Sequence, residues 1–151
     1  MNTINFQLVT PERTVLQQEL VSLSCPTSLG QITVLPHHIA LVANLIPGEL
    51  HARTEKDDFY VYVAGGFVEI RPGNQVIVLA DAAEHHFEID VSLAEAAKNK
   101  AEEEMKNRPT MSEQEYAKVA GVLQKNLARL NIARKHAGRK QPIANPSSLN
   151  G

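Results

Sequence analysis

The 151-residue sequence contains a single cysteine, Cys25, so it cannot form an internal disulfide. A lone thiol is typical of proteins from a reducing compartment, and we expect a cytoplasmic location. Long hydrophobic runs are also missing, because apolar stretches such as residues 39–43 fall far short of the roughly 20 residues that cross a bilayer as a helix. Any membrane association is therefore expected to be through a partner.

Positive charge is not in excess either. The 15 lysines and arginines are outnumbered by 17 acidic residues, which gives a net charge of -2 at neutral pH. Nucleic-acid-binding domains usually carry a strong basic field, so no nucleic-acid partner is expected. Hydrophobic residues make up 43% and charged residues 21% of the chain. These values are close to the averages of soluble globular proteins, so the chain is expected to fold.

The usual motifs of catalytic chemistry are absent: the sequence has no nucleophile elbow and no phosphate-binding glycine loop. The best enzyme hypothesis is a metal site built from the residues His37, His38, Asp81, Glu84, His85 and His86. Their spacing matches no standard zinc motif, and adjacent histidines on a strand point to opposite faces. We therefore expect a non-catalytic protein that binds no metal.

The first half of the chain does contain short β-branched and aromatic runs separated by turn residues. Residues 4–8 alternate between apolar and polar types, which indicates a half-buried strand. A Pro-Gly-Asn sequence at 72–74 predicts a hairpin. Further runs of strand length occupy residues 21–25, 32–35, 59–63, 67–70 and 76–79. This spacing predicts a β-sandwich or barrel over residues 1–86.

Helical patterns follow the strands. Ser92 and Glu95 predict a capping box at the start of a first helix that ends near Asn107. Its expected inward residues are Ala94, Ala97 and Ala101, and its expected surface ion pairs are Lys98–Glu102 and Glu102–Lys106. Pro109 interrupts this helix, because proline lacks a backbone donor.

Ser112 and Glu115 predict a second capping box and a second helix. The apolar stripe expected on it comprises Tyr116, Val119, Leu123, Leu127 and Leu130. Gly138 is the predicted stop. The short link predicts an antiparallel helical hairpin over residues 87–138, called the arm below, followed by a disordered tail over residues 139–151. The arm has a thin apolar seam, so we expect it to pack on the β-domain or on another protein and to move between them.

The order of several short motifs resembles the epsilon subunit of bacterial F-type ATP synthase. Each motif alone is weak, but their order and spacing are hard to obtain by chance, and the likeness covers all but about the last dozen residues. The motifs occupy residues 9–12 (VTPE), 34–38 (VLPHH), 47–50 (PGEL), 63–70 (VAGGFVEI), 78–84 (VLADAAE) and 127–130 (LARL).

This resemblance implies a non-catalytic central-stalk subunit that couples ion flow through the c ring to ATP synthesis. The β-sandwich is expected at the foot of the gamma subunit, against the c-subunit ring. The arm is expected to fold down on the sandwich, or to extend along gamma toward the alpha and beta catalytic subunits and hinder ATP hydrolysis. The location implied is the cytoplasmic face of the bacterial cell membrane, as a peripheral part of the complex.

Two short segments match the family's contact with the c ring and gamma: Leu29, Gly30 and Gln31, and then Pro36, His37 and His38. Gln31 stands where some members carry an acidic residue, so the electrostatic contact is expected to be weaker here. From the residues alone, an ordinary sandwich loop followed by a proline turn is the favoured interpretation, because turns usually have no other role; only the resemblance reverses this preference.

Some family members bind ATP in the folded arm, and the matching positions here are Glu84, Asp90, Lys125 and Arg129. Leu93 and Lys125 replace two expected arginines, and lysine does not reproduce bidentate phosphate recognition. We therefore expect ATP binding to be weak or absent and no cofactor to be required. Asp90 has an alternative role near the start of the first helix, where negative charge is favourable.

Cations crowd the end of the second helix. The resemblance implies that Arg129, Arg134 and Lys135 contact acidic surfaces when the arm extends. The alternative is that they are solvated cations at a helix C-terminus, where positive charge is favourable. The competing function for the whole chain is a generic adaptor that presents a mobile arm to an unrelated partner.

Overall fold

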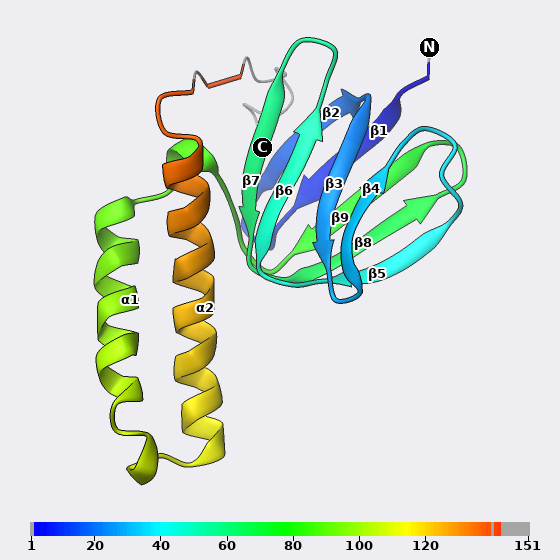
Figure 1. Ribbon diagram of the computed structural model, residues 1–151. Coiled ribbons are helices and arrows are strands. Elements are labelled where there is room, and N and C mark those ends of the chain that lie inside the picture. The colour runs from blue at the N-terminus through cyan, green and yellow to red at the C-terminus, as the bar shows by residue number, and fades with distance from the viewer. Residues whose placement is uncertain (1, 140, 143–151) are drawn as a thin grey trace.

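The computed structural model describes residues 2–139, 141 and 142; most of the predicted disordered tail lies outside these residues. Within these residues the chain forms ten strands, two α-helices and two short 3-10 helices (Figure 1). The strands are β1 Ile4–Val9, β2 Thr14–Leu20, β3 Ser22–Thr27, β4 Gly30–Val34, β5 Leu41–Leu45, β6 Gly48–Arg53, β7 Asp58–Val63, β8 Gly66–Arg71, β9 Gln75–Ala80 and β10 Ala83–His85. The sequence predictions of an N-terminal β-sandwich and two C-terminal helices are confirmed.

The strands follow one another in the order β10-β7-β6-β3-β5-β8-β9-β1-β2, and β4 pairs with the other side of β3. The sheet folds over between β3 and β5, which are joined by the pair Thr27 and Leu45. This fold places β10, β7, β6, β3 and β4 in one layer over β5, β8, β9, β1 and β2 in the other (Figure 1). Neighbouring strands are antiparallel except β1 and β9, which are parallel.

The core between the layers is built by period-two alternation, as the sequence predicts for the first strand. Ile4, Phe6 and Leu8 are at most 1% exposed, and their polar neighbours face outward. Each of the strands β2 to β10 also contributes at least one buried residue to this core. Burial of these side chains supplies the main stability of the domain without any contribution from the helices.

The predicted hairpin at residues 72–74 joins β8 to β9, with Gly73 and Asn74 in the left-handed region at φ values of 84° and 60°. Gly66 has a φ of 117°, and a Cβ there would lie 2.0 Å from the carbonyl oxygen of Leu79. Only glycine fits this close approach of two strands. One strand is longer than expected: β3 continues through Pro26, which pairs with Gln31.

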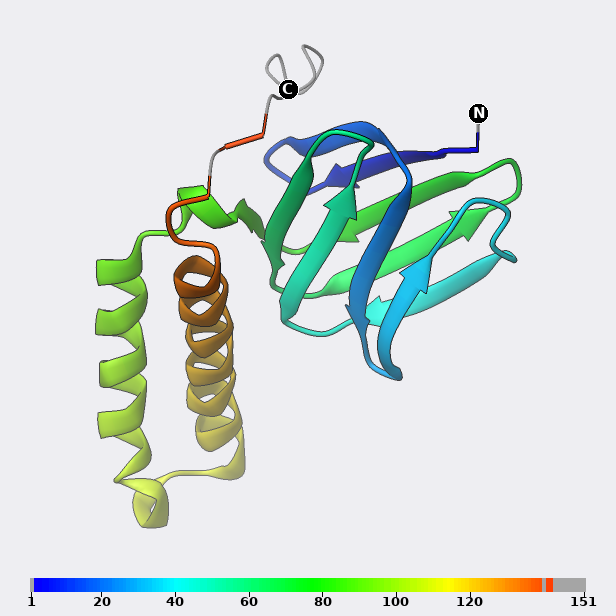
Figure 2. The same cartoon turned by 45° about the horizontal axis from the view of Figure 1, so that its top comes forward.

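The arm consists of α1 Val91–Met105, a 3-10 turn η2 Arg108–Thr110, and α2 Glu113–Lys135. The two helices run antiparallel and stand to one side of the sandwich (Figure 2). α2 begins as predicted, because the Ser112 hydroxyl accepts a hydrogen bond from the Glu115 backbone at 3.0 Å. Gly138, at a φ of 83°, follows the end of α2. None of the helices in the described part of the chain is long and apolar enough to cross a membrane.

The predicted start of α1 is wrong. Asp90 is the N-cap, and its carboxylate accepts a hydrogen bond from the Leu93 backbone at 3.0 Å. Ser92 already lies inside the helix, and Glu95 pairs with Arg134 instead of closing a capping box. Asp and Ser are both good N-caps, so the sequence pattern alone misplaces the boundary by two residues.

Packing between the helices follows the predicted alanines, since Ala94 and Ala101 are at most 2% exposed. On α2, Leu130 is buried but Leu127 is 48% exposed, which contradicts the predicted stripe; Asn126 is buried in its place. The predicted pair Lys98–Glu102 forms at 3.5 Å, whereas Lys106 pairs with Glu103 and not with Glu102. The C-terminal part of α2 packs against the sandwich as well as against α1. The side of the helix that is buried therefore changes along its length.

Candidate functional site at the junction of arm and sandwich

The arm touches the sandwich through a small apolar cluster that is separate from the main core. Its centre consists of Tyr62 on β7, Ile89 after the 3-10 turn η1 (His86–Glu88), and Ile132 and Ala133 on α2. All four are at most 9% exposed. Burial raises the pKa of Tyr62 to about 12, so its phenol stays neutral at physiological pH. The junction therefore has a neutral apolar centre, and its charges lie around the edge.

Arg129 on α2 forms the first polar contact at this edge. Its Nε lies 3.0 Å from Oε1 of Glu84 on β10, and its Nη2 donates to Oε2 at 3.1 Å. The remaining nitrogen, Nη1, donates to Oδ1 of Asn126 at 3.0 Å. The buried Asn126 amide in turn donates to the Val122 carbonyl at 2.9 Å. Both terminal nitrogens of Arg129 thus donate to protein oxygens, while the buried Nε lies close to Glu84 without forming a hydrogen bond.

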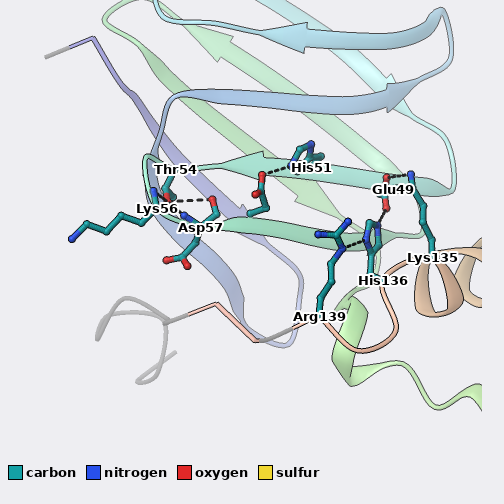
Figure 3. Close-up of polar contacts among 9 residues, drawn as sticks. Glu49, His51, Thr54, Lys56, Asp57, Lys135, His136 and Arg139 are labelled. Atoms are coloured by element: carbon teal, nitrogen blue, oxygen red, sulfur yellow. Dashed lines mark hydrogen bonds and ion pairs between the residues drawn. The ribbon is translucent and has the colours of Figure 1, made fainter.

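Glu49 on β6 forms the second polar contact and receives two side chains from the end of α2 (Figure 3). Lys135 Nζ lies 3.2 Å from Oε2 of Glu49, and Nε2 of His136 bonds to Oε1. On the other side of the imidazole, Arg139 Nε donates to Nδ1 at 3.0 Å. His136 is only 1% exposed.

Tyr60 on β7 stacks against the imidazole ring of His136. The two rings stack with centroids 3.6 Å apart and planes 17° apart. His51 stacks beside Tyr60, with ring centroids 4.5 Å apart, and bonds to Asp58 at 2.8 Å. The Arg139 guanidinium carbon lies 5.0 Å from the Tyr60 ring centroid. The end of the arm therefore packs on the stacked rings of Tyr60 and His51.

The residues that match the family's ATP positions separate into different roles. Glu84 and Arg129 bind each other, while Asp90 caps α1. Lys125 is exposed on α2, and Leu93 is 66% exposed at the start of α1. Of the predicted inhibitory cations, Arg129 and Lys135 reach carboxylates of the sandwich, whereas Arg134 pairs with Glu95 inside the arm.

The two segments expected to contact the c ring and gamma lie at opposite ends of β4. Leu29, at the tip of the β3–β4 hairpin, is 92% exposed, and Gly30 follows at a φ of 113°. At the far end of β4, His37 adopts a φ of 70°, and its backbone N–H donates to Oδ1 of Asn74 at 2.6 Å. The first two residues of β4, Gly30 and Gln31, belong to the first segment, and the strand ends at Val34, two residues before the second segment begins. Large apolar side chains are also exposed along this region, at Leu35, Ile39, Val42 and Ile46.

The histidines of the metal-site hypothesis are scattered. His37 and His38 lie in the turn after β4, whereas His85 and His86 lie at the arm junction. His85 Nε2 donates to the Val15 carbonyl at 3.0 Å. Burial lowers the pKa of both His85 and His86, so both favour the neutral form. Among residues 2–139, 141 and 142, no cluster of three or more His, Cys, Asp or Glu side chains is arranged to hold a metal ion.

Sequence reasoning missed Glu49, Tyr60 and His136. Glu49 lies within the PGEL motif, where the proline and glycine predict a turn and nothing in the pattern assigns a role to the glutamate. His136 follows the last apolar position of α2 and belongs to no periodic stripe. Their contact spans 87 positions in sequence, so no local pattern joins them.

Two family models match the chain in succession. Residues 3–86 match the ATP synthase Delta/Epsilon chain beta-sandwich domain, and residues 88–134 match the long alpha-helix domain of the same chain. The chain is 37% identical over 144 residues to the ATP synthase epsilon chain of Dehalococcoides mccartyi, covering 94% of this chain and 99% of that one. It is 40% identical over 134 residues to the epsilon chain of Moorella thermoacetica, covering 88% and 98% respectively.

A similar fold is found in a solved structure. One chain of the Euglena gracilis mitochondrial ATP synthase, OSCP/F1/c-ring in rotational state 1, aligns with a TM-score of 0.76 and 21% sequence identity. The alignment covers 90% of this chain and 83% of the Euglena chain. At this level of identity the likeness concerns the fold, including the succession of sandwich and helices.

Proposed function

This chain belongs to the ATP synthase epsilon-chain family, and from that premise we propose how its two parts divide the work of a central-stalk subunit. It is a non-catalytic subunit of the F-type ATP synthase. We assign torque transmission between the c ring and the catalytic head to the sandwich. We assign control of ATP hydrolysis to the arm.

The sandwich is proposed to contact gamma and the c ring through Leu29–Gln31 and Pro36–His38. Support comes from the exposed apolar side chains near these segments, including Leu29 and Ile39 at 92% and 79% exposure. Side chains this apolar and this exposed would lose contact with water on binding another protein, which favours association. With these contacts the subunit would lie at the cytoplasmic face of the membrane, attached only through the complex.

The arm is proposed to leave the sandwich and extend along gamma toward the alpha and beta subunits. The observation that carries this proposal is the pairing of Arg129 with Glu84 and of Lys135 with Glu49 across the junction. Both cations are neutralised while the arm is docked, and both become available to acidic surfaces when it extends. Arg134 keeps its partner Glu95 in either state, because that pair lies within the arm.

The small size of the junction supports such a movement. Its apolar cluster is separate from the sandwich core, so releasing the arm leaves the β-domain intact. Pairs with a well-exposed partner, such as Lys135 at 58% exposure, stabilise by only about 0–1 kcal/mol. The docked and extended positions can therefore be close in free energy.

We further propose that ATP binds this arm weakly or not at all. Both terminal guanidinium nitrogens of Arg129 already donate to Asn126 or Glu84, so a phosphate would have to displace a protein partner from them. Leu93 offers no charge where the family pattern has an arginine. The arm can therefore dock without nucleotide.

Replacement of Arg129, Arg134 and Lys135 together by alanine tests the proposed inhibition. ATP hydrolysis by a complex reconstituted with the triple variant should exceed that of the complex with the unaltered subunit. Because the variant also loses docking contacts, binding of the subunit to the complex is measured in parallel. Unchanged inhibition at full occupancy would show that these three cations are solvated residues at a helix end and take no part in inhibition.

A further inference from the structure

We propose that Glu49, His136 and Arg139 form a latch that holds the arm on the sandwich without any ligand. This inference rests on the proposed mobility of the arm and names the contact that regulates it. The latch lies at the last turn of α2, where the helix meets β6 and β7 (Figure 3). His136 is the C-cap residue of α2, and its backbone N–H bonds to the Ile132 carbonyl at 3.2 Å.

The partners of His136 define its hydrogen positions. A guanidinium N–H can only donate, so Nδ1 of His136 accepts from Arg139. An ionised carboxylate can only accept, so Nε2 carries the proton and donates to Glu49. The neutral imidazole therefore connects a donor and an acceptor through one flat ring. Histidine alone provides this combination together with an aromatic face.

Stacking fixes the orientation of that ring. The ring centroids of Tyr60 and His136 lie 3.6 Å apart, and His51 also stacks on Tyr60, with centroids 4.5 Å apart. Aromatic contacts of this kind add stability beyond the area that they bury. The ring can therefore present its two nitrogens to Glu49 and Arg139 without a large loss of side-chain freedom on docking.

Burial separates the latch from ordinary surface pairs. The His136 side chain is 1% exposed and Glu49 is 22% exposed, whereas Lys135 on the same carboxylate is 58% exposed. A buried hydrogen bond to a charged group stabilises more than an exposed ion pair, and an unpaired Glu49 or His136 would be costly. Glu49 and His136 are thus expected to dominate, with Lys135 contributing little.

Thiol labelling measures arm release directly. In an Ala133→Cys background the new thiol lies in the buried cluster of the junction and reacts with a maleimide only when the arm opens. The native Cys25 is buried in the sandwich core, and burial raises its pKa to about 12. Cys25 therefore reacts only when the sandwich itself opens. The ratio of the two labelling rates, measured on the full chain without nucleotide, separates arm release from unfolding.

In this background we compare Glu49→Gln with His136→Phe. The phenylalanine removes the hydrogen bonds to Glu49 and Arg139 but keeps an aromatic ring. Each should raise the labelling rate of the cysteine at 133 about tenfold or more, with no change at Cys25. Lys135→Ala should change it less than about threefold. Glu69→Gln is the matched control, because it breaks an exposed pair with Arg71 elsewhere on the sandwich and should have no effect.

Ile89→Lys provides the test of mobility, since it places a charge in the apolar cluster of the junction. If Ile89→Lys accelerates labelling at position 133 but Glu49→Gln and His136→Phe do not, the latch is overturned and the mobile arm stands. If even Ile89→Lys leaves labelling at 133 as slow as at Cys25, the arm does not move independently. That result overturns the proposed mobility, and the latch with it.

Discussion

The guanidinium of Arg129 lies against both carboxylate oxygens of Glu84, with nitrogen–oxygen distances of 3.0 and 3.1 Å. The pair joins the second helix of the arm to the last strand of the sandwich, across 45 positions of sequence. Both side chains are less than one third exposed, so solvent screens the interaction only in part. This contact and the Glu49 latch hold the two edges of one small apolar cluster.

A double-mutant cycle of Arg129→Ala and Glu84→Gln measures the strength of that contact. We expect a coupling free energy of about 1 to 2 kcal/mol, because the pair is two-pronged and partly buried. Arg129→Lys should recover less than half of it, since an ammonium cannot face both oxygens in the same way. Arg71→Ala, which removes an exposed pair, is the control and should not change urea unfolding measurably. A coupling near zero would assign the docking to apolar contacts alone.

Acid should weaken the junction through His86. Burial lowers the pKa of His86, and the positive charge of the nearby Arg139 lowers it further. Because the folded state favours the neutral ring, this stability is fully present above the unfolded pKa of about 6.5 and is lost as pH falls through the lower folded pKa. His86→Phe should therefore lose less thermal stability than the unaltered protein between pH values of about 7.5 and 5. Exposed His38, changed to Gln, serves as the control; an equal loss in all three proteins would rule out this role.

Gly66 should tolerate no side chain. A Cβ would lie 2.0 Å from the Leu79 carbonyl oxygen in a backbone with a φ of 117°. We expect Gly66→Ala to lower the free energy of unfolding by about 3 kcal/mol or more, because backbone strain and a backbone clash add. Gly73→Ala, which meets no atom within 4 Å at a φ of 84°, should lose only about 1 kcal/mol. Equal losses in urea titrations would mean that the clash is relieved by strand movement.

The N-cap of α1 should be Asp90 and not Ser92. Asp90→Ala removes the bond to the Leu93 amide and should destabilise the arm by about 1 kcal/mol. Ser92→Ala should be neutral or slightly stabilising, because alanine is the better residue inside a helix. Thermal unfolding, monitored by the helical signal in circular dichroism, distinguishes the effects of the two substitutions. A larger loss from Ser92→Ala would restore the boundary that the sequence pattern predicts.

The regular parts of the fold follow from local patterns. Alternation at Ile4, Phe6 and Leu8 predicts a buried strand face, and the glycine and asparagine at 73 and 74 predict the hairpin. β2 and β6 are harder to predict. A register shift next to Val9 disturbs the pairing of β2 with β1, and β6 buries the small Ala52 beside Leu50. Such strands are defined by their neighbours more than by their own composition.

The stripe on α2 shows where helix periodicity fails. A pattern with one apolar face predicts Leu127 inside, but the last turns of α2 pack on both α1 and the sandwich. The buried face shifts so that it includes Asn126 and Ile132, while Leu127 remains 48% exposed. Which side chain becomes buried depends on the elements that pack against the helix, and helical periodicity carries no information about those elements.

The candidate site was predictable only where a resemblance supplied the positions. Glu84 and Arg129 were identified in that way, although the structure joins them to each other. Glu49 and His136 carry no local signal, because their chemistry arises from a contact between a strand and a helix end that are far apart in sequence. Titratable residues of this kind become informative only when the fold shows which of them are buried together.

Reconstitution of an ATP synthase depleted of its epsilon subunit tests the central claim most directly. The purified chain should co-purify with gamma and restore ATP-driven proton or sodium pumping in membrane vesicles. A generic adaptor would show neither property. Failure to bind gamma and to restore coupling, with a folded protein at saturating concentration, would contradict the assignment of this chain to the central stalk.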